Sequence, residues 1–361
     1  MSVPIIDFYA FQNGTEQERR ELAHRITEEF KKHGATRLIN HGIDGETIKK
    51  VYEWSDKFFK LSETEKAAIA NVRDANPQRG YSYVGSEATS KVNKKNANGE
   101  FQICEDDDVA QDLEDVKEHF DFTRDGDPDY PTPWPSEASI PGFHNWMEGI
   151  FLPECQKLAR DVLTAIEIGL NVPEGTFTAC MESGVDELRI QHYPPLSTRT
   201  LHTGKIQRCH PHTDFGFITL LFQDATGGLE IEDRANGGWI PVVPTGEPTE
   251  VGVYISDTLV HKPNGHLKAA VHQVTAPVSL KNKQDGFLPE RYTVALFAKA
   301  DRHANIGPLP QFITTETPSV SPTSLRWSYI TSELVSCMTP GPRPHLLLFD
   351  FAVVPYQLEM L

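Results

Sequence analysis

The motif His-x-Asp occurs twice in this chain, at His119 and Asp121 and again at His212 and Asp214. In an extended segment, side chains two residues apart point to the same side, so a histidine and a carboxylate at this spacing can reach one metal ion. The first copy lies among many acidic residues, and we predict that it forms a solvent-exposed acidic face. The second copy directly precedes the apolar run Phe215–Phe222, which is typical of a strand. We therefore predict the metal site at the second copy.

A third ligand is available at His272, in the strand-like segment Ala269–Val274. Two histidines and one carboxylate on one face of a metal, with the opposite positions open, are typical of non-haem Fe(II) oxygenases. A single histidine in a sheet more often bonds a backbone carbonyl, so the prediction depends on the three residues together. His210 stands two residues before His212 and can lie on the same side. A fourth protein ligand would close a position that O₂ needs, so we expect His210 to line the pocket or to contact the ligands.

An arginine and a hydroxyl follow the last histidine, at Arg291 and Thr293. Because they are two residues apart, they lie on one face of a strand. An arginine fork and a hydroxyl hydrogen bond suit the distal carboxylate of a 2-oxo acid. The pair therefore indicates a co-substrate site beside the metal.

Several longer stretches resemble those of one enzyme family. HTDFGFITLLFQDATGGLEI, NGHLKAAVHQV and RYTVALF resemble the 2-oxoglutarate/Fe(II)-dependent dioxygenases of the isopenicillin-N-synthase-like group. IIDF near the start, INHGI at 39–43, GY at 80–81, PWP at 133–135 and LRIQHYPP at 188–195 follow in the family's order. The resemblance thus covers most of the chain, with some likeness to ethylene-forming enzymes.

The resemblance implies that His212, Asp214 and His272 bind Fe(II). It also implies that Arg291 and Thr293 hold the distal carboxylate of 2-oxoglutarate, with O₂ as the second co-substrate. Further residues that the resemblance places near the co-substrate are Tyr193 and, as a weaker candidate, Arg189.

Two positions depart from the family pattern. Thr293 stands where serine is usual, which preserves the hydroxyl group. The interval between His272 and Arg291 is longer than is common in the family, and we interpret 281–286 as an inserted hairpin loop. Such an insertion puts the strand register of Arg291 in question.

The elements that must position these residues are mostly short strands. We expect a mainly β fold with helices, namely a double-stranded β-helix (jelly roll) that has an N-terminal helical region and a long buttressing helix over Gly142–Gly169. Helices are also expected after Thr15, around 48–59 and after Ser62, whereas residues 71–140 are expected to form long loops. Seven core strands are expected at 188–193, 217–222, 229–231, 239–243, 251–255, 270–276 and 292–298.

We expect one compact domain over residues 1–361, because no linker separates the helices from the strands. Its regions are an N-terminal α/β and loop region at 1–140, the buttressing helix region at 141–187, the catalytic jelly-roll core at 188–300 and a C-terminal segment at 301–361.

Composition excludes several other classes. The chain has 361 residues and a formal net charge of −17, so a nucleic-acid or anionic membrane partner is not expected. No apolar run approaches the roughly 20 residues that span a bilayer, and the N-terminus lacks the pattern of a signal peptide, so we expect a cytoplasmic protein. Five scattered cysteines argue against disulfides and structural zinc. The sequence does not predict the oligomeric state.

The expected function is oxidation, by default hydroxylation, of a C–H bond in a small organic molecule, with release of succinate and CO₂. Amino acids, nucleobases and small products of specialised metabolism are the substrate classes that the resemblance suggests. Alternatives are an iron oxidase of the same fold that does not use 2-oxoglutarate, an ethylene-forming enzyme and a structural metal site. Candidate residues of the substrate pocket, each of which ordinary packing would also explain, are Tyr81, Tyr83, Phe101, His210, Phe215, Arg326 and Trp327.

Overall fold

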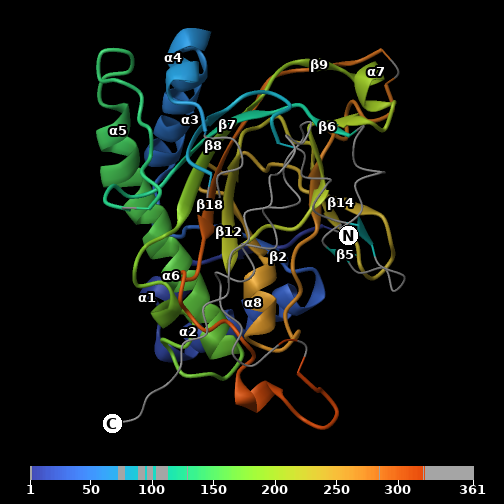
Figure 1. Ribbon diagram of the computed structural model, residues 1–361. Coiled ribbons are helices and arrows are strands. Elements are labelled where there is room, and N and C mark those ends of the chain that lie inside the picture. Colours follow the sequence, from blue (N-terminus) through green and yellow to red (C-terminus); the bar gives the residue numbers. More distant parts are fainter. Residues whose placement is uncertain are drawn as a thin grey trace, which may run out of the picture.

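The structure is a computed structural model that describes residues 2–71, 78–87, 113–127, 129–283, 285–319 and 321, together with the backbone of 94–95 and 101–102. A large sheet runs through the centre of the molecule. Helices α1 to α6 gather on one side of it, and the smaller sheet that contains β14 lies on the other (Figure 1). None of the helices in the described ranges is long and apolar enough to cross a membrane.

The first helices begin where the sequence predicts. At the start of α2 the Thr15 side chain accepts from the backbone of Glu18, whose carboxylate accepts from the backbone of Thr15, and Ser62 and Glu65 form the same capping box at α4. Each box satisfies backbone donors that a helix start would leave free. The elements of this region are β1 (Ile5–Asp7), α1 (Tyr9–Asn13), α2 (Glu16–Lys32), β2 (Ala35–Ile39), α3 (Gly45–Phe59) and α4 (Glu63–Ala68).

The predicted long helix is present and contains one irregular turn. It consists of α5 (Phe143–Trp146), the π-helical turn η2 (Met147–Phe151) and α6 (Leu152–Gly169). Helix α6 contacts β12 and β18 of the large sheet as well as α2. At the crossing with α2, a Cβ on Gly169 would lie 2.0 Å from Oγ1 of Thr27, so only glycine permits this approach. The helix therefore packs against the large sheet.

The large sheet has eight strands in the order β1-β2-β15-β12-β18-β8-β7-β3. Neighbouring strands are antiparallel except for the parallel pair β1 and β2. The strands not yet given are β3 (Gly80–Ser82), β7 (Glu118–Phe122), β8 (Glu187–Tyr193), β12 (Ile218–Gln223), β15 (Val251–Ile255) and β18 (Arg291–Ala298). The strands predicted at 188–193, 217–222, 251–255 and 292–298 are thereby confirmed.

The smaller sheet has the order β11-β16-β13-β14 and is antiparallel throughout. Its strands are β11 (Cys209–His212), β16 (His272–Val274), β13 (Leu229–Glu232) and β14 (Trp239–Pro241). Three of these strands were predicted, but β11 was not, because the sequence Cys-His-Pro-His has little of the β-branched and aromatic character of a strand. Together the two sheets confirm the expected jelly-roll fold.

The long loops expected over 71–140 are confirmed at 123–127 and 129–140 and interrupted by strands such as β7, while 72–77, 88–93, 96–100 and 103–112 lie outside the described residues. The prediction of an exposed acidic face at His119 and Asp121 was wrong. These two residues lie on β7, between β8 and β3, and both side chains are 0% exposed. On the other face of β7, Phe120 and Phe122 pack into the main core. Arg189, from the neighbouring strand β8, pairs with Asp121. The acidic residues around His119 and Asp121 gave no indication that β8, which is distant in the sequence, supplies Arg189 as a partner.

Short elements complete the described chain. The segment interpreted as an inserted hairpin leads into a strand that pairs with β9 instead of folding back on itself. The remaining elements are β4 (Lys94–Lys95), β5 (Phe101–Gln102), β6 (Glu114–Asp115), η3 (Thr178–Cys180), β9 (Leu196–Ser197), α7 (Thr198–Leu201), β10 (Ile206–Gln207), α8 (Asp257–His261), β17 (Phe287–Leu288) and η4 (Pro310–Phe312).

Candidate active site

His212, Asp214 and His272 come together between the two sheets. His212 and His272 are paired residues on the adjacent strands β11 and β16, and Asp214 follows β11 closely. Oδ1 of Asp214 lies 3.7 Å from Nε2 of His212 and 3.8 Å from Nε2 of His272. One ligand atom from each of the three residues lies within 4.8 Å of the others. This spacing allows all three to bind a single ion.

Hydrogen bonds orient both imidazoles for such a role. Nδ1 of His212 lies 2.8 Å from the carbonyl of His210, and Nδ1 of His272 lies 3.0 Å from the carbonyl of Ala270. A carbonyl only accepts, so each Nδ1 carries the proton and each Nε2 keeps its lone pair for a metal. Burial lowers the pKa of His272 to about 4, which keeps this imidazole neutral.

The carboxylate of Asp214 completes the donor set. Its Oδ2 atom is buried and has no hydrogen-bond partner among the described residues. Leaving a buried carboxylate oxygen without a donor or a cation is costly. Two imidazoles and one such carboxylate fit a divalent transition metal such as Fe(II).

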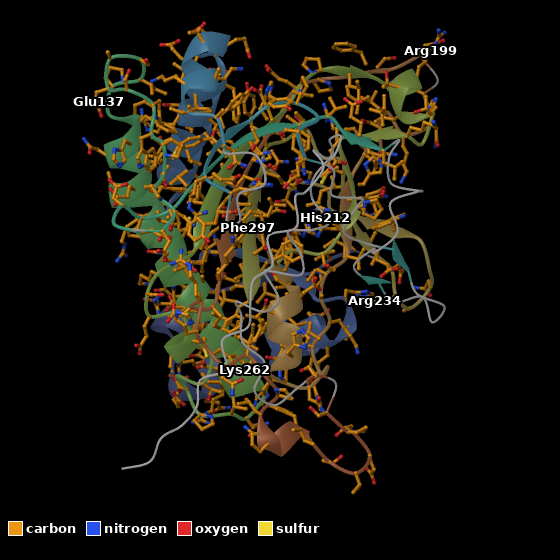
Figure 2. The ribbon with its side chains drawn as sticks, in the orientation of Figure 1. Glu137, Arg199, His212, Arg234, Lys262 and Phe297 are labelled. Atoms are coloured by element: carbon orange, nitrogen blue, oxygen red, sulfur yellow. The ribbon has the colours of Figure 1, made fainter. Side chains whose placement is uncertain are left out.

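A cavity of about 130 Å³ surrounds these residues. In the view of Figure 2, His212 and Phe297 lie near the middle of the molecule, whereas Glu137 and Arg199 lie at its periphery. The long wall of the cavity is formed by the paired strands β8 and β18. From one end to the other, the paired residues that line it are Arg291 and Tyr193, Thr293 and Gln191, Ala295 and Arg189, and Phe297 and Glu187.

Arg291, a buried cation, lies at one end of this wall. The side chain of Arg291 is 0% exposed, and its one hydrogen bond in the described structure joins Nη2 to Oε1 of Gln223 at 3.2 Å. Nε and Nη1 have no partner among the described residues. The guanidinium carbon lies 4.9 Å from the centre of the Tyr193 ring, and Thr293 lines the same face. A buried cation without a described counter-ion suits the carboxylate of a ligand. The longer interval before Arg291 has therefore not moved this residue off the cavity face.

Arg208 is a second buried arginine that sequence reasoning missed. It is 0% exposed, and its Nη2 donates to the carbonyl of Pro289. Its guanidinium carbon lies 6.0 Å from the centre of the Tyr193 ring, and burial, together with the charge of Arg291, lowers its pKa to about 10. Nothing in its sequence context distinguishes it from a surface arginine.

Comparisons with known proteins agree with this arrangement. The family model described as "non-haem dioxygenase in morphine synthesis N-terminal" matches residues 3–139, and that of the "2OG-Fe(II) oxygenase superfamily" matches residues 185–300. The chain is 38% identical to the 2-oxoglutarate-dependent dioxygenase imqE of Aspergillus flavus, over 88% of this chain and 90% of that protein. It is also 38% identical to the 2-oxoglutarate-dependent dioxygenase ecdK of Aspergillus rugulosus, over 87% and 92%.

The fold is also similar to that of solved structures. The crystal structure of a full-length Neurospora crassa protein in complex with α-ketoglutarate and thymine matches with a TM-score of 0.78 and 29% identity, over 92% of this chain and 96% of that one. The chain belongs to the 2OG-Fe(II) oxygenase superfamily. As a member, it is an enzyme that uses Fe(II), 2-oxoglutarate and O₂ to oxidise a small organic molecule.

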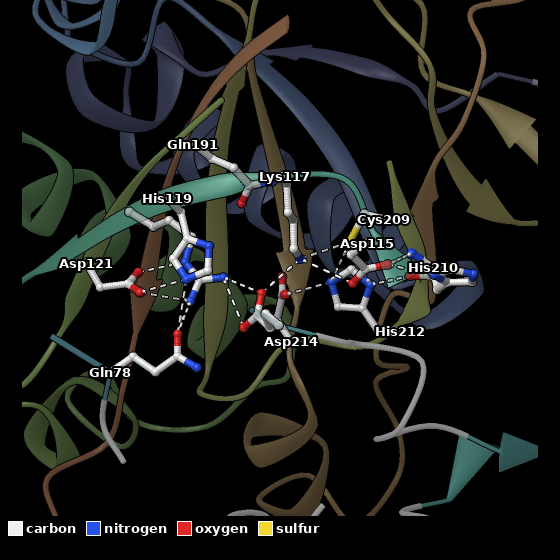
Figure 3. A network of polar contacts seen from close by, with 12 residues as sticks. Gln78, Asp115, Lys117, His119, Asp121, Gln191, Cys209, His210, His212 and Asp214 are labelled. Carbon is white, nitrogen blue, oxygen red and sulfur yellow. Dashed lines mark hydrogen bonds and ion pairs between the residues drawn. The ribbon is translucent and has the colours of Figure 1, made fainter. Parts of the chain in front are cut away.

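A network of polar contacts that includes His212 and Asp214 extends to Arg189 and Asp121, farther from Arg291 in the oxygenase cavity (Figure 3). Arg189 donates from Nε to Oδ1 of Asp121 at 2.6 Å and from Nη2 to Oδ2 at 3.1 Å. Its Nη1 lies 3.1 Å from Oε2 of Glu87, and its Nη2 also lies 3.1 Å from Oε1 of Gln78. Burial would raise the pKa of Glu87, but Arg189 and Lys117 hold it well below its usual range. Arg189 therefore has counter-ions, whereas Arg291 has none among the described residues.

The predicted pocket residues of the oxygenase lie in different surroundings, some at the cavity and others in the core or at the surface. Phe215 lines the cavity. His210 is not among the lining residues; its Nδ1 lies 2.6 Å from Oδ1 of Asp115. Tyr81 packs in the main core, and its hydroxyl donates to Glu118, while Tyr83 is 59% exposed. The side chains of Phe101, Arg326 and Trp327 lie outside the described residues.

Several residues of the oxygenase cavity were not singled out from the sequence. They include a buried lysine, Lys117, whose Nζ lies 2.9 Å from Glu87 and 3.3 Å from Sγ of Cys209. Lys117 directly precedes β7 in the segment 71–140, which we predicted to form loops, so the sequence did not single it out. Alternation with Arg189 and Thr293 would have indicated other lining residues, namely Gln191, Ala295 and Phe297.

Proposed function

We propose that His212, Asp214 and His272 hold the Fe(II) of this oxygenase, and that Arg291, with Thr293 and Tyr193, binds the distal carboxylate of 2-oxoglutarate. When bound, Fe(II) with 2-oxoglutarate and O₂ supplies the oxidising power that breaks a C–H bond and yields succinate and CO₂. The protein's own part is to hold, orient and shield.

The observation that carries this proposal is the order of groups along one cavity. Three metal donors and a buried cation without a described counter-ion line the same space. 2-Oxoglutarate carries two negative charges, one at each end. With one carboxylate at Arg291, the molecule points its other end away from the cation and along the wall toward the metal donors.

The alternation of β18 supports the position of the substrate. From Arg291 to Phe297 the strand rises about 20 Å, at roughly 3.3 Å per residue. The co-substrate occupies the Arg291 end, which leaves the part lined by Ala295 and Phe297 for a second small molecule. Apolar side chains there, Phe215 among them, exclude water from the reacting groups. Hydroxylation is the outcome that we propose by default.

Arg189 is a poorer candidate for the co-substrate. Its charge is already balanced by Asp121 and Glu87, so a ligand carboxylate would have to displace one of them. We therefore assign the co-substrate to Arg291 and leave Arg189 to the substrate end.

The test combines metal content with isotope labelling. Purified protein is loaded anaerobically with Fe(II) and 2-oxoglutarate and then exposed to ¹⁸O₂, and succinate is analysed by mass. One labelled oxygen is expected in succinate, and Asp214→Ala is expected to lose both iron and succinate formation. Glu148→Gln is the matched control, because Glu148 belongs to a separate surface group of metal-donor side chains with Asp125 and His144. Iron loss in the control instead of in Asp214→Ala would overturn the assignment.

A further inference from the structure

Apart from Arg291 and the metal donors, the charged residues that line the cavity are paired with opposite charges in the described structure. Taken with their Lys, Arg, Asp and Glu partners they are four cations and four carboxylates, of which Lys117 lies nearest the metal donors, through Cys209. Each cation contacts a carboxylate: Arg189 contacts Asp121 and Glu87, Lys117 contacts Glu87 and Asp115, and Arg79 and Lys299 both contact Glu187.

These pairs are closely spaced, and all of their members are buried except Lys299, which is partly exposed. Nζ of Lys117 lies 2.9 Å from Glu87, Nζ of Lys299 lies 3.0 Å from Glu187, and Nη1 of Arg79 lies 2.5 Å from the same carboxylate. At such short range in a water-poor interior, each pair is held strongly together. Breaking one to accommodate a ligand charge would leave a buried ion without a partner, which typically costs several kcal/mol.

Arg189 and Arg291 therefore differ although both line the same cavity. All three nitrogens of Arg189 have an acceptor: Nε and Nη2 face Asp121, Nη2 also faces Gln78, and Nη1 faces Glu87. Arg291 contacts one neutral amide and has two nitrogens without a described partner. An anion gains new charge-assisted hydrogen bonds at Arg291, whereas at Arg189 it would compete with two fixed carboxylates.

The carboxylates that balance Arg189 remain ionised. Burial disfavours the charged form of Asp121, but Arg189 and His119 lower its pKa below the usual range. The pKa of Glu87 is likewise held low by Arg189 and Lys117 against the effect of burial. The neutralisation of Arg189 thus persists over the range of pH in which proteins usually work.

The uncharged lining at the Arg189 end of the cavity can still recognise polar groups. The side-chain amide of Gln78 lines the cavity there, and Phe297 offers a ring whose centre lies 5.4 Å from the guanidinium carbon of Arg189. Gln191 lies one residue pair nearer to Arg291, and its amide donates to the hydroxyl of Tyr193. Amides provide both donors and acceptors, and the ring provides a flat apolar surface. A ligand with uncharged donors and acceptors on a flat group can use all of these features without breaking an ion pair.

We propose that the Arg189 end of the cavity binds an uncharged, hydrogen-bonding part of the substrate, such as an amide or lactam, and that Asp121 and Glu87 enforce this choice by neutralising Arg189. The cavity then sorts its two ligands by charge: the dianionic co-substrate goes to Arg291 and the uncharged group goes to Arg189. This inference rests on the proposed function, because it takes the metal and the co-substrate to lie where we assign them.

The experiment uses three probes of similar size and different charge: benzamide, benzoate and benzylammonium. Full-length protein is loaded with Mn(II) and 2-oxoglutarate at pH 8, where ordinary histidines are neutral. Dissociation constants are measured from the paramagnetic relaxation that Mn(II) causes in the protons of each probe. We expect benzamide to bind at least about fivefold more tightly than either charged probe, since the charged probes lose hydration without gaining a counter-ion.

Asp121→Asn and Glu87→Gln each remove one negative charge while keeping the side-chain shape. In either variant the affinity for benzoate relative to benzamide is expected to rise about tenfold, the value of one charge-assisted hydrogen bond. If Asp121→Asn does not fold, the comparison is made with Glu87→Gln alone. The matched control is Asp285→Asn, which makes the same change in an exposed ion pair with Arg199 and is expected to leave all three affinities unchanged.

Two results would overturn the inference. One is that the unmodified protein binds benzoate or benzylammonium as tightly as benzamide, or binds none of the probes. The other is that both variants leave the ratio of benzoate to benzamide unchanged. Failure of the proposed function looks different: Asp214→Ala would then retain Mn(II) binding and the relaxation of the probes, which would show that the metal is bound elsewhere.

Discussion

Replacing Arg291 tests how the cavity holds its co-substrate. The guanidinium is buried, its single hydrogen bond among the described residues goes to the neutral side chain of Gln223, and Nε and Nη1 lack described partners. Two nitrogens on one edge can bind a carboxylate through two parallel hydrogen bonds. Glutamine at this position removes both the charge and the fork, whereas lysine keeps the charge and loses the fork.

The expected losses follow from the value of charge-assisted hydrogen bonds. Each is worth about 1.5–3 kcal/mol, and about 1.4 kcal/mol corresponds to a tenfold change in affinity. We expect Arg291→Lys to weaken 2-oxoglutarate binding roughly tenfold and Arg291→Gln to weaken it on the order of 100-fold. The assay is calorimetric titration of the Mn(II)-loaded protein with 2-oxoglutarate and, as a control ligand, with 2-oxobutanoate, which lacks the distal carboxylate.

The control ligand decides the interpretation. If Arg291 acts on the distal carboxylate, the affinity for 2-oxobutanoate stays within about threefold in both variants, because this ligand has nothing to lose there. Equal losses for both ligands would show a general disturbance of the cavity. Unchanged 2-oxoglutarate binding in Arg291→Gln would refute the reasoning and point to Arg208, the other buried arginine near Tyr193.

Asp214→Ala should abolish Mn(II) binding measured by electron paramagnetic resonance, and retained stoichiometric binding would contradict the assigned ligand. Asp121→Asn should lower the free energy of unfolding in urea by roughly 3 kcal/mol, because its buried arginine partner then keeps Glu87 as its one ion pair among the described residues. The exposed Asp285→Asn should change it by less than about 0.5 kcal/mol. Burial lowers the pKa of His41 to about 4 from the 6.5 of an exposed histidine, so the unfolded chain gains this proton first. Stability should therefore be full above pH 6.5 and fall by up to roughly 3 kcal/mol as the pH drops toward 4; a His41→Gln variant with the same pH slope would contradict this.

The sequence predicted the strands whose pattern is local. Leu188–Tyr193 and Tyr292–Ala298 have dense β-branched and aromatic residues, and the structure confirms both strands. The spacing of Arg291 and Thr293 also placed both side chains on one face, since alternation is a property of any strand. For the same reason the sequence could predict that His212 and Asp214 reach one metal ion, without knowledge of the partner strand.

What the sequence could not predict depends on contacts between distant segments. His119 and Asp121 look solvent-exposed when the letters around them are read alone, but β8 brings Arg189 against Asp121 and buries the strand. Tyr81 was a candidate for the pocket, with ordinary packing as the alternative, and the structure shows it packed in the core with its hydroxyl bonded to Glu118. A charge or a hydroxyl becomes buried when a partner is close in space, and such partners follow from the topology of the sheet.

The central claim is that one iron ion is bound by His212, Asp214 and His272. It is tested most directly by anomalous diffraction at the iron edge, from crystals of the full chain grown anaerobically with Fe(II) and 2-oxoglutarate. We expect a single strong peak between Nε2 of the two histidines and the carboxylate of Asp214. A peak at the surface group around His144, with no density among the three cavity residues, would contradict the account.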